Sequence, residues 1–512
     1  MKEKFGAFSK GNAFTKGRPS RLVLLAVGLV LIVLLAGLLF VRPQEIAALP
    51  PMGDQLRNAS QGLDEITITA TFSPDQRQLY ATQRMTLQNR SGLLLQDVVL
   101  RTYANAFASQ DYSPAAIEEF FDSCYPNGFS AGGIAFSKVL VDGNEAAYAF
   151  ADEAKTVLHL SLSKTWQPGD TLEIDLTYVL TIPECAYRFG YASGIYTIGN
   201  AFPTLAVMRD GQWRAEEYFP LGDPFMTECA NYHVTVTTPE GYQCAGSAYP
   251  AVTRENSLQT FTFEAPAVRD FALSISNRFT VAAQQTGNVL VSSYGLSTQG
   301  AQEALKYAVQ ALQCFEEQYG PYPYQHFAVS VVDFPFGGME YPSLVLLQSS
   351  LYGKGQELEW VAAHETAHQW WYATVGSDQY FQPWQDEALA EYSLLNYVEK
   401  YYGERAWGDM AFQRIETAMR VTIPQGVTPG SPIDYFGSLS EYSLVVYRRG
   451  AALMLALETA MGDTFQDFLR VYYEKFAFKL ASRSDFEETL QAVSGQDWSA
   501  LTVDYLDTYI EN

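Results

Sequence analysis

The sequence is poor in cysteine. Five cysteines in 512 residues, widely spaced and without a C-x-x-C pair, exclude both a dense disulfide framework and a zinc ribbon. Their spacing leaves room for one or two disulfides, and the odd number leaves at least one thiol over. Basic residues are also scarce, because 33 Lys and Arg stand against 57 Asp and Glu and give a formal net charge of -24. Such an acidic chain excludes nucleic acid as a partner held through phosphate contacts.

The chain also lacks internal repeats and low-complexity segments. With 48% hydrophobic and 18% charged residues it is too apolar to be disordered. Its length is sufficient for two or more domains, each with its own core.

One long apolar run stands out against this background. Residues 22–41 contain no charge and no side-chain amide, and Arg21 and Arg42 flank them. Twenty helical residues span roughly 30 Å, so this segment is predicted to cross a membrane once. The basic tail of residues 1–21 predicts a cytoplasmic N-terminus and places the remaining chain outside the cytoplasm. A cleaved signal peptide would have a shorter apolar region and a small-x-small cleavage site, and a buried core helix would have a polar face.

The next part of the chain is predicted to be a linker followed by a β domain. Residues 42–62 are rich in proline and glycine and indicate a spacer. Apolar and polar residues then alternate with a period of two, as in 66–72 and 172–178, with turn signals between such segments. Residues 63–281 are therefore expected to form an antiparallel, all-β domain.

The pattern becomes mostly helical from about residue 301, so residues 282–512 are predicted to form a second, mostly α domain. One short strand is expected at residues 327–332. The predicted helices cover residues 301–319, 356–375, 384–400, 443–461, 463–475 and 484–492.

The clearest chemical signal is His364-Glu365-Thr366-Ala367-His368, an H-E-x-x-H motif on the helix predicted at 356–375. Two of the five histidines of the chain lie here. Residues four apart share one helix face, so both imidazoles can bind one zinc ion at about 2.0–2.1 Å. Glu365 lies one position round the helix, where it can act as general base on a water at the metal.

A catalytic zinc site usually has three protein ligands and one open position. Glu387 is the candidate for the third ligand, because it follows His368 after 18 residues and lies on the next predicted helix. Glu391, one turn further on, is either a solvated charge or support for the ligands, and we do not assign it to the metal.

Two further segments could contact a substrate. Gly337-Gly338-Met339-Glu340 follows the predicted strand, and the two glycines would let an extended peptide approach closely while Glu340 holds an ammonium group. Tyr447 lies near the start of the helix predicted at 443–461. Taken alone, the glycines could mark a turn and Tyr447 could be a buried core residue.

Together these segments resemble the gluzincin family of zinc aminopeptidases, which includes membrane alanyl aminopeptidase and leukotriene hydrolase. The spacing of 18 residues between the second His and the ligand Glu is that family's pattern. The resemblance covers roughly residues 66–512 and extends more loosely through Gly199-Asn200 and Gly222-Asp223-Pro224 in the β half.

The resemblance implies a thermolysin-like catalytic domain with one zinc ion, bound by His364, His368 and Glu387. It implies that Glu340, with Gly338 and Met339 beside it, binds the free amine of a peptide, and that Tyr447 stabilises the oxyanion. Tyr442 matches a second active-site tyrosine of the family.

The sequence departs from the family pattern at several positions. Tyr341 replaces the family's Asn in G-A-M-E-N, and Arg449 replaces Lys in Y-x-K-G. The family's second amine-binding residue is not identifiable, and Asn200 is our candidate for it. The chain also ends soon after the catalytic domain, so a short form without the helical C-terminal domain of longer members is expected, with a more open cleft.

The sequence therefore predicts a membrane-anchored zinc aminopeptidase that hydrolyses peptides with a zinc-activated water. An endopeptidase, another zinc hydrolase such as an epoxide hydrolase, and a non-catalytic peptide-binding ectodomain are the alternatives. The ectodomain is disfavoured because a binding module has no need of Glu365 or Tyr447. Cleavage of free compared with N-acetylated peptides distinguishes the enzymatic alternatives.

Overall fold

The computed structural model describes residues 49–508. The predicted transmembrane segment at 22–41, the basic tail and the start of the spacer lie outside the described residues. Within 49–508 no helix combines the length and the apolar character needed to cross a membrane. The described part of the spacer contains one short helix, α2 (Asp54–Ala59).

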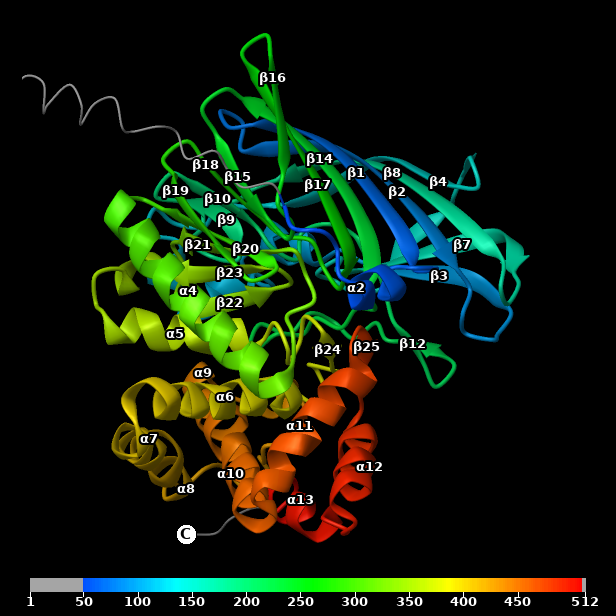
Figure 1. Cartoon of the computed structure of the whole chain (residues 1–512). Helices are drawn as coiled ribbons and strands as arrows, with labels where there is room; N and C mark the ends of the chain where they lie inside the picture. Colours follow the sequence, from blue (N-terminus) through cyan, green and yellow to red (C-terminus); the bar gives the residue numbers. More distant parts are fainter. Residues whose placement is uncertain (1–48, 509–512) are drawn as a thin grey trace, which may run out of the picture. The chain divides into compact units, whose positions relative to one another are not determined.

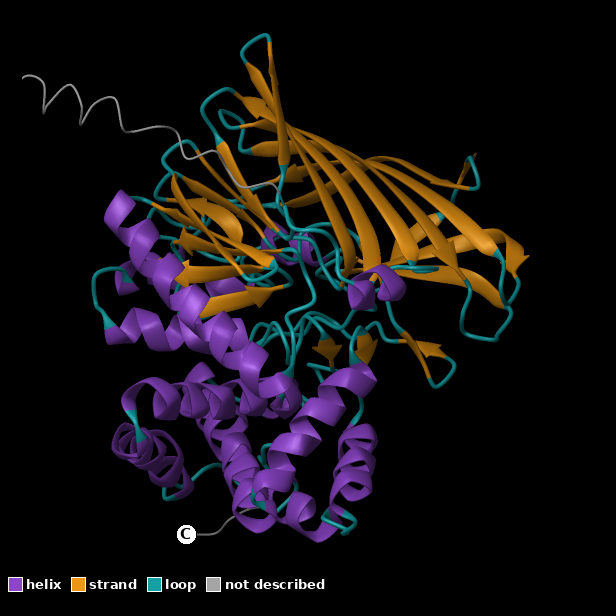
Figure 2. Ribbon diagram, in the orientation of Figure 1, coloured by secondary structure: helices purple, strands orange, loops and turns teal. Residues whose placement is uncertain are grey.

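The first domain is built around a large twisted sheet of eight strands (Figures 1 and 2). Its strands run in the order β16-β17-β14-β1-β2-β8-β4-β5. Their bounds are β16 (Ala251–Glu255), β17 (Leu258–Val268), β14 (Ala230–Pro239), β1 (Asp64–Ser73), β2 (Gln78–Gln88), β8 (Thr171–Thr181), β4 (Gly133–Val141) and β5 (Asn144–Glu145). The alternation seen in the sequence determines which face of the sheet is buried. Ile66, Ile68 and Ala70 are buried, while the threonines between them are exposed.

The expectation of a purely antiparallel domain is wrong at one pairing. Strands β1 and β14 pair in parallel, with Ile66 opposite Tyr232 and Ala70 opposite Val236. Parallel neighbours need a long crossover, and here about 150 residues of the domain separate the two strands in sequence. A period of two predicts that a strand exists but not the direction of its partner.

Smaller sheets and short helices complete this domain. One four-stranded sheet has the order β15-β18-β10-β9, another has the order β11-β3-β7-β6, and β12 pairs with β13. The bounds are β15 (Gln243–Gly246), β18 (Leu273–Ser276), β10 (Ile195–Ile198), β9 (Phe189–Ala192), β11 (Thr204–Leu205), β3 (Leu95–Arg101), β7 (Val157–Trp166), β6 (Tyr148–Phe150), β12 (Met208–Arg209), β13 (Gln212–Trp213), η1 (Tyr103–Ala108), η2 (Pro114–Ala116) and α3 (Phe121–Cys124). All five cysteines of the chain are buried and unpaired.

The second domain opens with a five-stranded mixed sheet in the order β19-β20-β21-β23-β22. The bounds are β19 (Thr280–Thr286), β20 (Val289–Gly295), β21 (His326–Val332), β23 (Leu344–Gln348), β22 (Gly338–Tyr341) and the short η3 (Ser349–Leu351). Helix α4 (Thr298–Tyr319) packs on β19 and β20, and helix α5 (Gln356–Ala367) packs on β22 and β23. Among residues 49–508, strand β22 pairs only with β23, so the Gly338 segment forms an edge of this sheet.

The remainder of the second domain is helical (Figure 2). Its elements are α6 (Trp384–Tyr402), α7 (Glu404–Ala411), the π-helical segment η4 (Phe412–Glu416), α8 (Thr417–Met419), η5 (Ile433–Tyr435), α9 (Leu439–Tyr442), the π-helical segment η6 (Ser443–Arg449), α10 (Gly450–Met461), α11 (Asp463–Phe476), α12 (Arg483–Ser494), α13 (Ser499–Leu506) and the strand pair β24 (Val375–Gly376) and β25 (Lys479–Leu480). The helix predicted at 443–461 thus begins as a π-helix.

The helix predicted at 356–375 is shorter than expected. It ends at Ala367, and His368 forms its C-cap. The chain then turns into β24, which pairs with β25 about a hundred residues later. This long-range pairing and the contacts of Arg269 compete with helix continuation, and local periodicity cannot reveal either of them.

Arg269 ties the two domains together. It comes from the β domain, is 1% exposed, and donates hydrogen bonds from Nε to the Tyr372 carbonyl at 2.8 Å and from Nη1 to the Thr227 carbonyl at 3.1 Å. Nη2 donates to the carbonyls of Thr374 and Lys479. One buried guanidinium therefore satisfies carbonyls on both sides of the domain boundary.

Replacing Arg269 with Met should destabilise the protein by about 3 kcal/mol or more, because it leaves buried carbonyls without donors. Urea unfolding followed by circular dichroism measures the loss. Arg84→Met is the control, since Arg84 forms a largely exposed pair with Asp175, and its midpoint should match that of the wild type. Equal midpoints for both variants would contradict the anchoring role of Arg269.

Candidate active site

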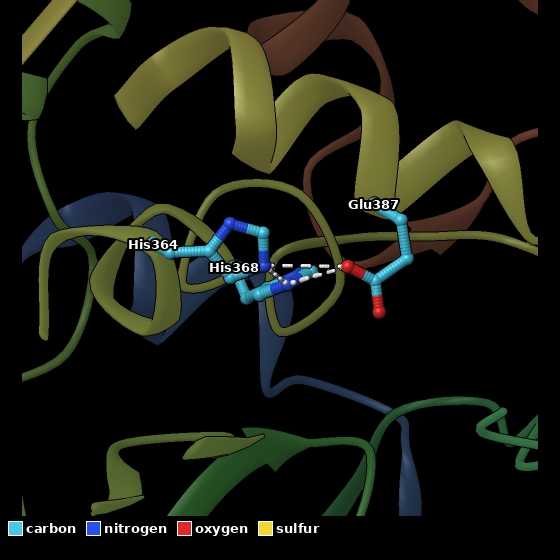
Figure 3. Close-up of side chains that lie close together, drawn as sticks. All are labelled: His364, His368 and Glu387. Atoms are coloured by element: carbon cyan, nitrogen blue, oxygen red, sulfur yellow. Dashed lines mark hydrogen bonds and ion pairs between the residues drawn. The ribbon is translucent and has the colours of Figure 1, made fainter. Parts of the chain in front are cut away.

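Helices α5 and α6 bring the three predicted metal ligands together (Figure 3). His364 Nε2 lies 3.2 Å from His368 Nε2 and 3.3 Å from Glu387 Oε2, and His368 Nε2 lies 3.4 Å from the same oxygen. Tetrahedral zinc with bonds of 2.0–2.1 Å holds its ligand atoms roughly 3.3–3.4 Å apart. The three atoms therefore already have the spacing of a zinc site.

The local structure explains this convergence. His364 lies in the last turn of α5 and His368 caps it, so the four-residue spacing keeps both rings on one side. Glu387 lies in the first turn of α6, which starts after Pro383, and α6 packs against α5. His368 and Glu387 are only 1% and 2% exposed, so both ligands are largely shielded from water.

Partners behind the histidines orient their rings. Nδ1 of His368 donates to the Trp371 carbonyl at 3.1 Å, which leaves Nε2 free to bind the metal. Nδ1 of His364 faces Oε2 of Glu391 at 3.6 Å. Burial acts to raise the pKa of Glu391, but the charge of Arg414 and the nearby His364 hold it below its usual range. Glu391 is thus an ionised support for His364 and not a metal ligand.

Glu365 is next to the metal ligands and is 6% exposed. A Cβ at Gly338 would lie 2.3 Å from its carboxyl group, so the edge strand β22 passes directly over this side chain and only glycine fits there. Burial raises the pKa of Glu365 to about 7, which suits a group that exchanges protons near neutral pH.

Tyr447 faces the metal ligands from the π-helical segment η6. Its ring stacks on that of His364, with centroids 5.7 Å apart and planes 11° apart. Burial and the adjacent Glu387 carboxylate raise the pKa of Tyr447 well above its ordinary value, so the phenol remains a hydrogen-bond donor. Tyr442 lies beside it, with ring centroids 5.7 Å apart.

Glu340 comes from β22 and reaches the same site. It is 3% exposed, and its Oε1 has no hydrogen-bond partner among residues 49–508. Burial, together with neighbouring carboxylates, raises its pKa well above the ordinary value. A buried carboxylate with an unsatisfied oxygen is costly unless a ligand pairs with it.

Asp223, which the β domain contributes to the site, was not predicted from the sequence. Carboxylate oxygens of Asp223, Glu340 and Glu387 lie within 4.8 Å of one another. Nη1 of Arg188 donates to Oδ1 of Asp223 at 2.5 Å and fixes its position. The signal available in the sequence was the Gly222-Asp223-Pro224 segment, whose Asp was not singled out.

Asn200, the candidate second amine-binding residue, has a different role. Its Nδ2 donates to Asp270 at 2.8 Å, and its Oδ1 accepts from the Tyr341 hydroxyl at 2.8 Å. A Cβ at Gly199 would lie 1.9 Å from that hydroxyl, so the larger side chain of Tyr341 requires glycine there. Asn200 and Tyr341 therefore fasten β22 to the β domain. Arg449 is the second position at which the sequence departs from the family pattern. It is buried and donates to the carbonyls of Ala418 and Val421.

These groups line one cleft of about 320 Å³. Its walls include Gly338, Met339, Glu340, Asp223, the zinc ligands, Glu365, Tyr442 and Tyr447. A candidate metal site, a proton acceptor, a phenol donor and a carboxylate pair thus meet in one cleft. A cavity of about 350 Å³ in the β domain contains none of these groups.

Comparison with known proteins matches part of the second domain to a known family. Residues 303–506 match the Peptidase family M1 domain. Aminopeptidase M1-A of rice (Oryza sativa subsp. japonica) is 25% identical over 328 residues, which are 60% of this chain and 37% of the rice protein. Aminopeptidase N of rabbit (Oryctolagus cuniculus) is 27% identical over 341 residues, 60% of this chain and 35% of the rabbit protein. The chain thus spans little more than a third of the length of these relatives.

Solved structures share the fold. An M1 zinc metallopeptidase from Deinococcus radiodurans superposes with a TM-score of 0.63 at 18% identity, covering 88% of this chain and 94% of its own. A two-domain M1 zinc metallopeptidase bound to L-arginine gives 0.63 at 17% identity, covering 88% and 95%. Residues 303–506 thus form a Peptidase family M1 domain, and the candidate zinc ligands His364, His368 and Glu387 lie within it.

Proposed function

We propose that this protein is a zinc aminopeptidase that removes residues from the N-terminus of peptides. The observation that carries the proposal is the buried carboxylate of Glu340, whose Oε1 has no hydrogen-bond partner in the described part of the chain, with Asp223 and Glu387 close to it. A free amine brings the positive charge and the donors that this group of oxygens lacks.

Formal charges in the cleft support an ammonium ligand. Four carboxylates line it, from Asp223, Glu340, Glu365 and Glu387, whereas Arg188 and a zinc ion provide three positive charges. Glu391 and Arg414 balance each other. One negative charge is left over, and the N-terminal ammonium group of a peptide would neutralise it.

Relatives point to the same substrate class. The rice and rabbit proteins are aminopeptidases by name, and a mutant of the Deinococcus enzyme has been solved with the substrate Tyr-Ser-Ala. Because the chain spans only about a third of the curated relatives, activity is inferred from the site and not from the names.

Residues of this chain account for each step of peptide hydrolysis. Zinc, when bound, supplies a Lewis acid that polarises the scissile carbonyl and makes water more acidic. Glu365 takes the proton from the attacking water and passes it to the leaving amine. The Tyr447 phenol donates to the oxygen on which negative charge develops. The edge strand β22 at Gly337-Gly338 offers backbone groups to an extended peptide, while Glu340 and Asp223 hold its amine.

An endopeptidase is the main alternative, and the position of Glu340 argues against it. A chain that continued beyond the amine position would place a neutral amide against buried carboxylates and leave their charge unpaired. An epoxide hydrolase has no need of an ammonium site at all.

Glu365→Gln should retain about one zinc per chain and lose about 10²–10⁴-fold in kcat, because it removes the base and leaves the ligands. Elemental analysis and peptide hydrolysis on the same preparation measure both quantities. Glu357→Gln, the same change on the exposed surface of α5, is the control and should behave as wild type. Zinc-loaded E365Q with normal turnover would rule out this base.

N-acetylation of a peptide should abolish its cleavage, because the acetylated nitrogen cannot form charge-assisted hydrogen bonds to Glu340 and Asp223. Glu340→Gln should raise KM and lower kcat together, for a combined loss of about 10²-fold or more in kcat/KM, and keep its zinc. Chromatographic product analysis distinguishes the outcomes. Efficient cleavage of an acetylated peptide at an internal bond would identify an endopeptidase instead.

We also propose that residues 22–41 anchor the protein in a membrane, with the catalytic site outside the cytoplasm. Support comes from the length of the apolar run and from the basic tail before it. Protease added to intact cells should degrade the part that contains residues 49–508, and alkaline carbonate should not release the protein from membranes. A cytoplasmic marker must survive the same treatment. Complete protection of the catalytic part would reverse the topology.

A further inference from the structure

The β domain contains a cavity of its own, which we call the β-domain cavity. Its volume is about 350 Å³, against about 320 Å³ for the active-site cleft, and the two share no lining residue. It lies where β1 begins and β2 ends, next to β12 (Figure 1). Cavities of this size accommodate small organic molecules.

Much of the cavity wall is aromatic. Trp166, Trp213 and Tyr232 line it together with several aliphatic side chains. The indole N–H of Trp166 donates to the Asp170 carbonyl at 2.9 Å, and that of Trp213 donates to Oδ1 of Asp97 at 3.4 Å. Because both N–H groups have partners outside the cavity lining, the two indoles offer apolar ring surface to an occupant.

Two hydroxyl groups on this wall lack partners. Thr204 and Thr227 are 6% and 7% exposed, and neither hydroxyl oxygen has a hydrogen-bond partner among residues 49–508. A buried hydroxyl without a partner costs free energy, and each hydroxyl can both donate and accept. An occupant with one polar group of the same kind would remove part of this cost.

The charged groups of the wall balance one another. Two are acidic, Asp64 and Glu228, and two are basic, Arg90 and Arg269. Nη1 of Arg90 donates to Oδ1 of Asp64 at 2.6 Å, and Arg269 donates to four backbone carbonyls. An anion would meet the charge of Glu228 and a cation would meet that of Arg269, so the wall favours an uncharged ligand. The active-site cleft, with its four carboxylates, has the opposite preference.

We propose that the β-domain cavity is a second ligand site, which binds a small, uncharged aromatic alcohol. The ring of the ligand packs against the aromatic wall, and its hydroxyl pairs with Thr204 or Thr227. Such a molecule matches the three properties of the wall, which are apolar ring surface, unpartnered hydroxyls and no net charge.

An occupant would also contact the boundary between the two domains. Phe478 belongs to the second domain and lines the cavity. Arg269 forms another part of the wall and donates to the Thr227 carbonyl at 3.1 Å. A ligand that binds only the folded protein stabilises it, so saturation should raise the midpoint of thermal unfolding by about 2 °C or more.

Equilibrium dialysis with 2-naphthol on the zinc-loaded, full-length protein tests this site, with a blank of the same detergent to correct for partitioning. Saturable binding of about one molecule per chain is expected. Naphthalene, which lacks the hydroxyl, should bind about 5-fold or more weakly. Neither 2-naphthoate nor 2-naphthylmethylammonium should displace 2-naphthol at equal concentration. Binding that does not saturate, or ready displacement by either ion, would overturn the proposal.

Valine substitutions locate the ligand. The double variant Thr204→Val, Thr227→Val removes both hydroxyls at nearly constant volume and should lower the affinity for 2-naphthol about 5-fold or more, without weakening naphthalene. The matched control is Thr286→Val, because Thr286 is also 6% exposed with an unpartnered hydroxyl in the described part of the chain but lies on β19, outside the cavity. Equal affinity of the double variant and the wild type would overturn the assignment to this cavity.

A cavity-filling variant provides a second test that does not depend on the hydroxyls. Ala206 is 1% exposed and lines the cavity, so Ala206→Leu should weaken 2-naphthol and naphthalene alike. Circular dichroism and zinc content establish that each variant is folded, since none of the substituted residues lines the active-site cleft. A folded Ala206→Leu protein with wild-type affinity for both compounds would show that they bind elsewhere and would overturn the proposal.

Discussion

The structure depends on the concentration of negative charge in one buried cleft. Asp223, Glu340, Glu365 and Glu387 are all buried, and burial together with the repulsion among neighbouring carboxylates raises the pKa values of Glu340 and Glu365. In the proposed function, a zinc ion and Arg188 would offset most of this repulsion, and the amine of the substrate would offset the remainder. The affinity of the cleft for cations therefore follows from its own electrostatics.

The β domain is part of the active site and not only a support. It supplies Asp223 and Arg188 to the cleft and holds the edge strand β22 through Asn200. Arg269 fixes the turn after His368, so the position of one zinc ligand depends on an interdomain contact. A single rigid unit is needed because a shift of about 1 Å in a ligand or an amine-binding group would be costly for catalysis.

Local sequence patterns predicted much of the fold and the position of the zinc ligands on α5. The period of two located β1 and β8, and the H-E-x-x-H spacing located the zinc helix, because both depend on neighbouring residues. Features set by distant contacts were not predictable in this way. They include the parallel pairing of β1 with β14, the end of α5 at Ala367, and the contribution of Asp223 to a cleft formed mostly by the other domain.

Tyr341 shows how a departure from a family pattern can be understood only in three dimensions. In the sequence it looks like the loss of an Asn from the amine-binding segment. In the structure its hydroxyl lies over Gly199 and donates to Asn200, so the large side chain, the glycine and the Asn belong to one arrangement. Tyr341 thus fastens β22 to the β domain, while Glu340, one residue earlier, lies beside the candidate metal ligands.

The π-helical segment η6 explains why Tyr447 can reach the zinc ligands. A residue added to a helical turn rotates everything after it by about 100°, the angle between successive residues of an α-helix. The segment between Tyr442 and Gly450 thus places Tyr447 against His364 while α10 keeps its apolar face in the core. A regular helix over residues 443–461 would lack this rotation and would orient Tyr447 differently relative to the core face of α10. The less stable geometry is retained where the chemistry needs it, which is the reason that periodicity alone identified this helix but not its distortion.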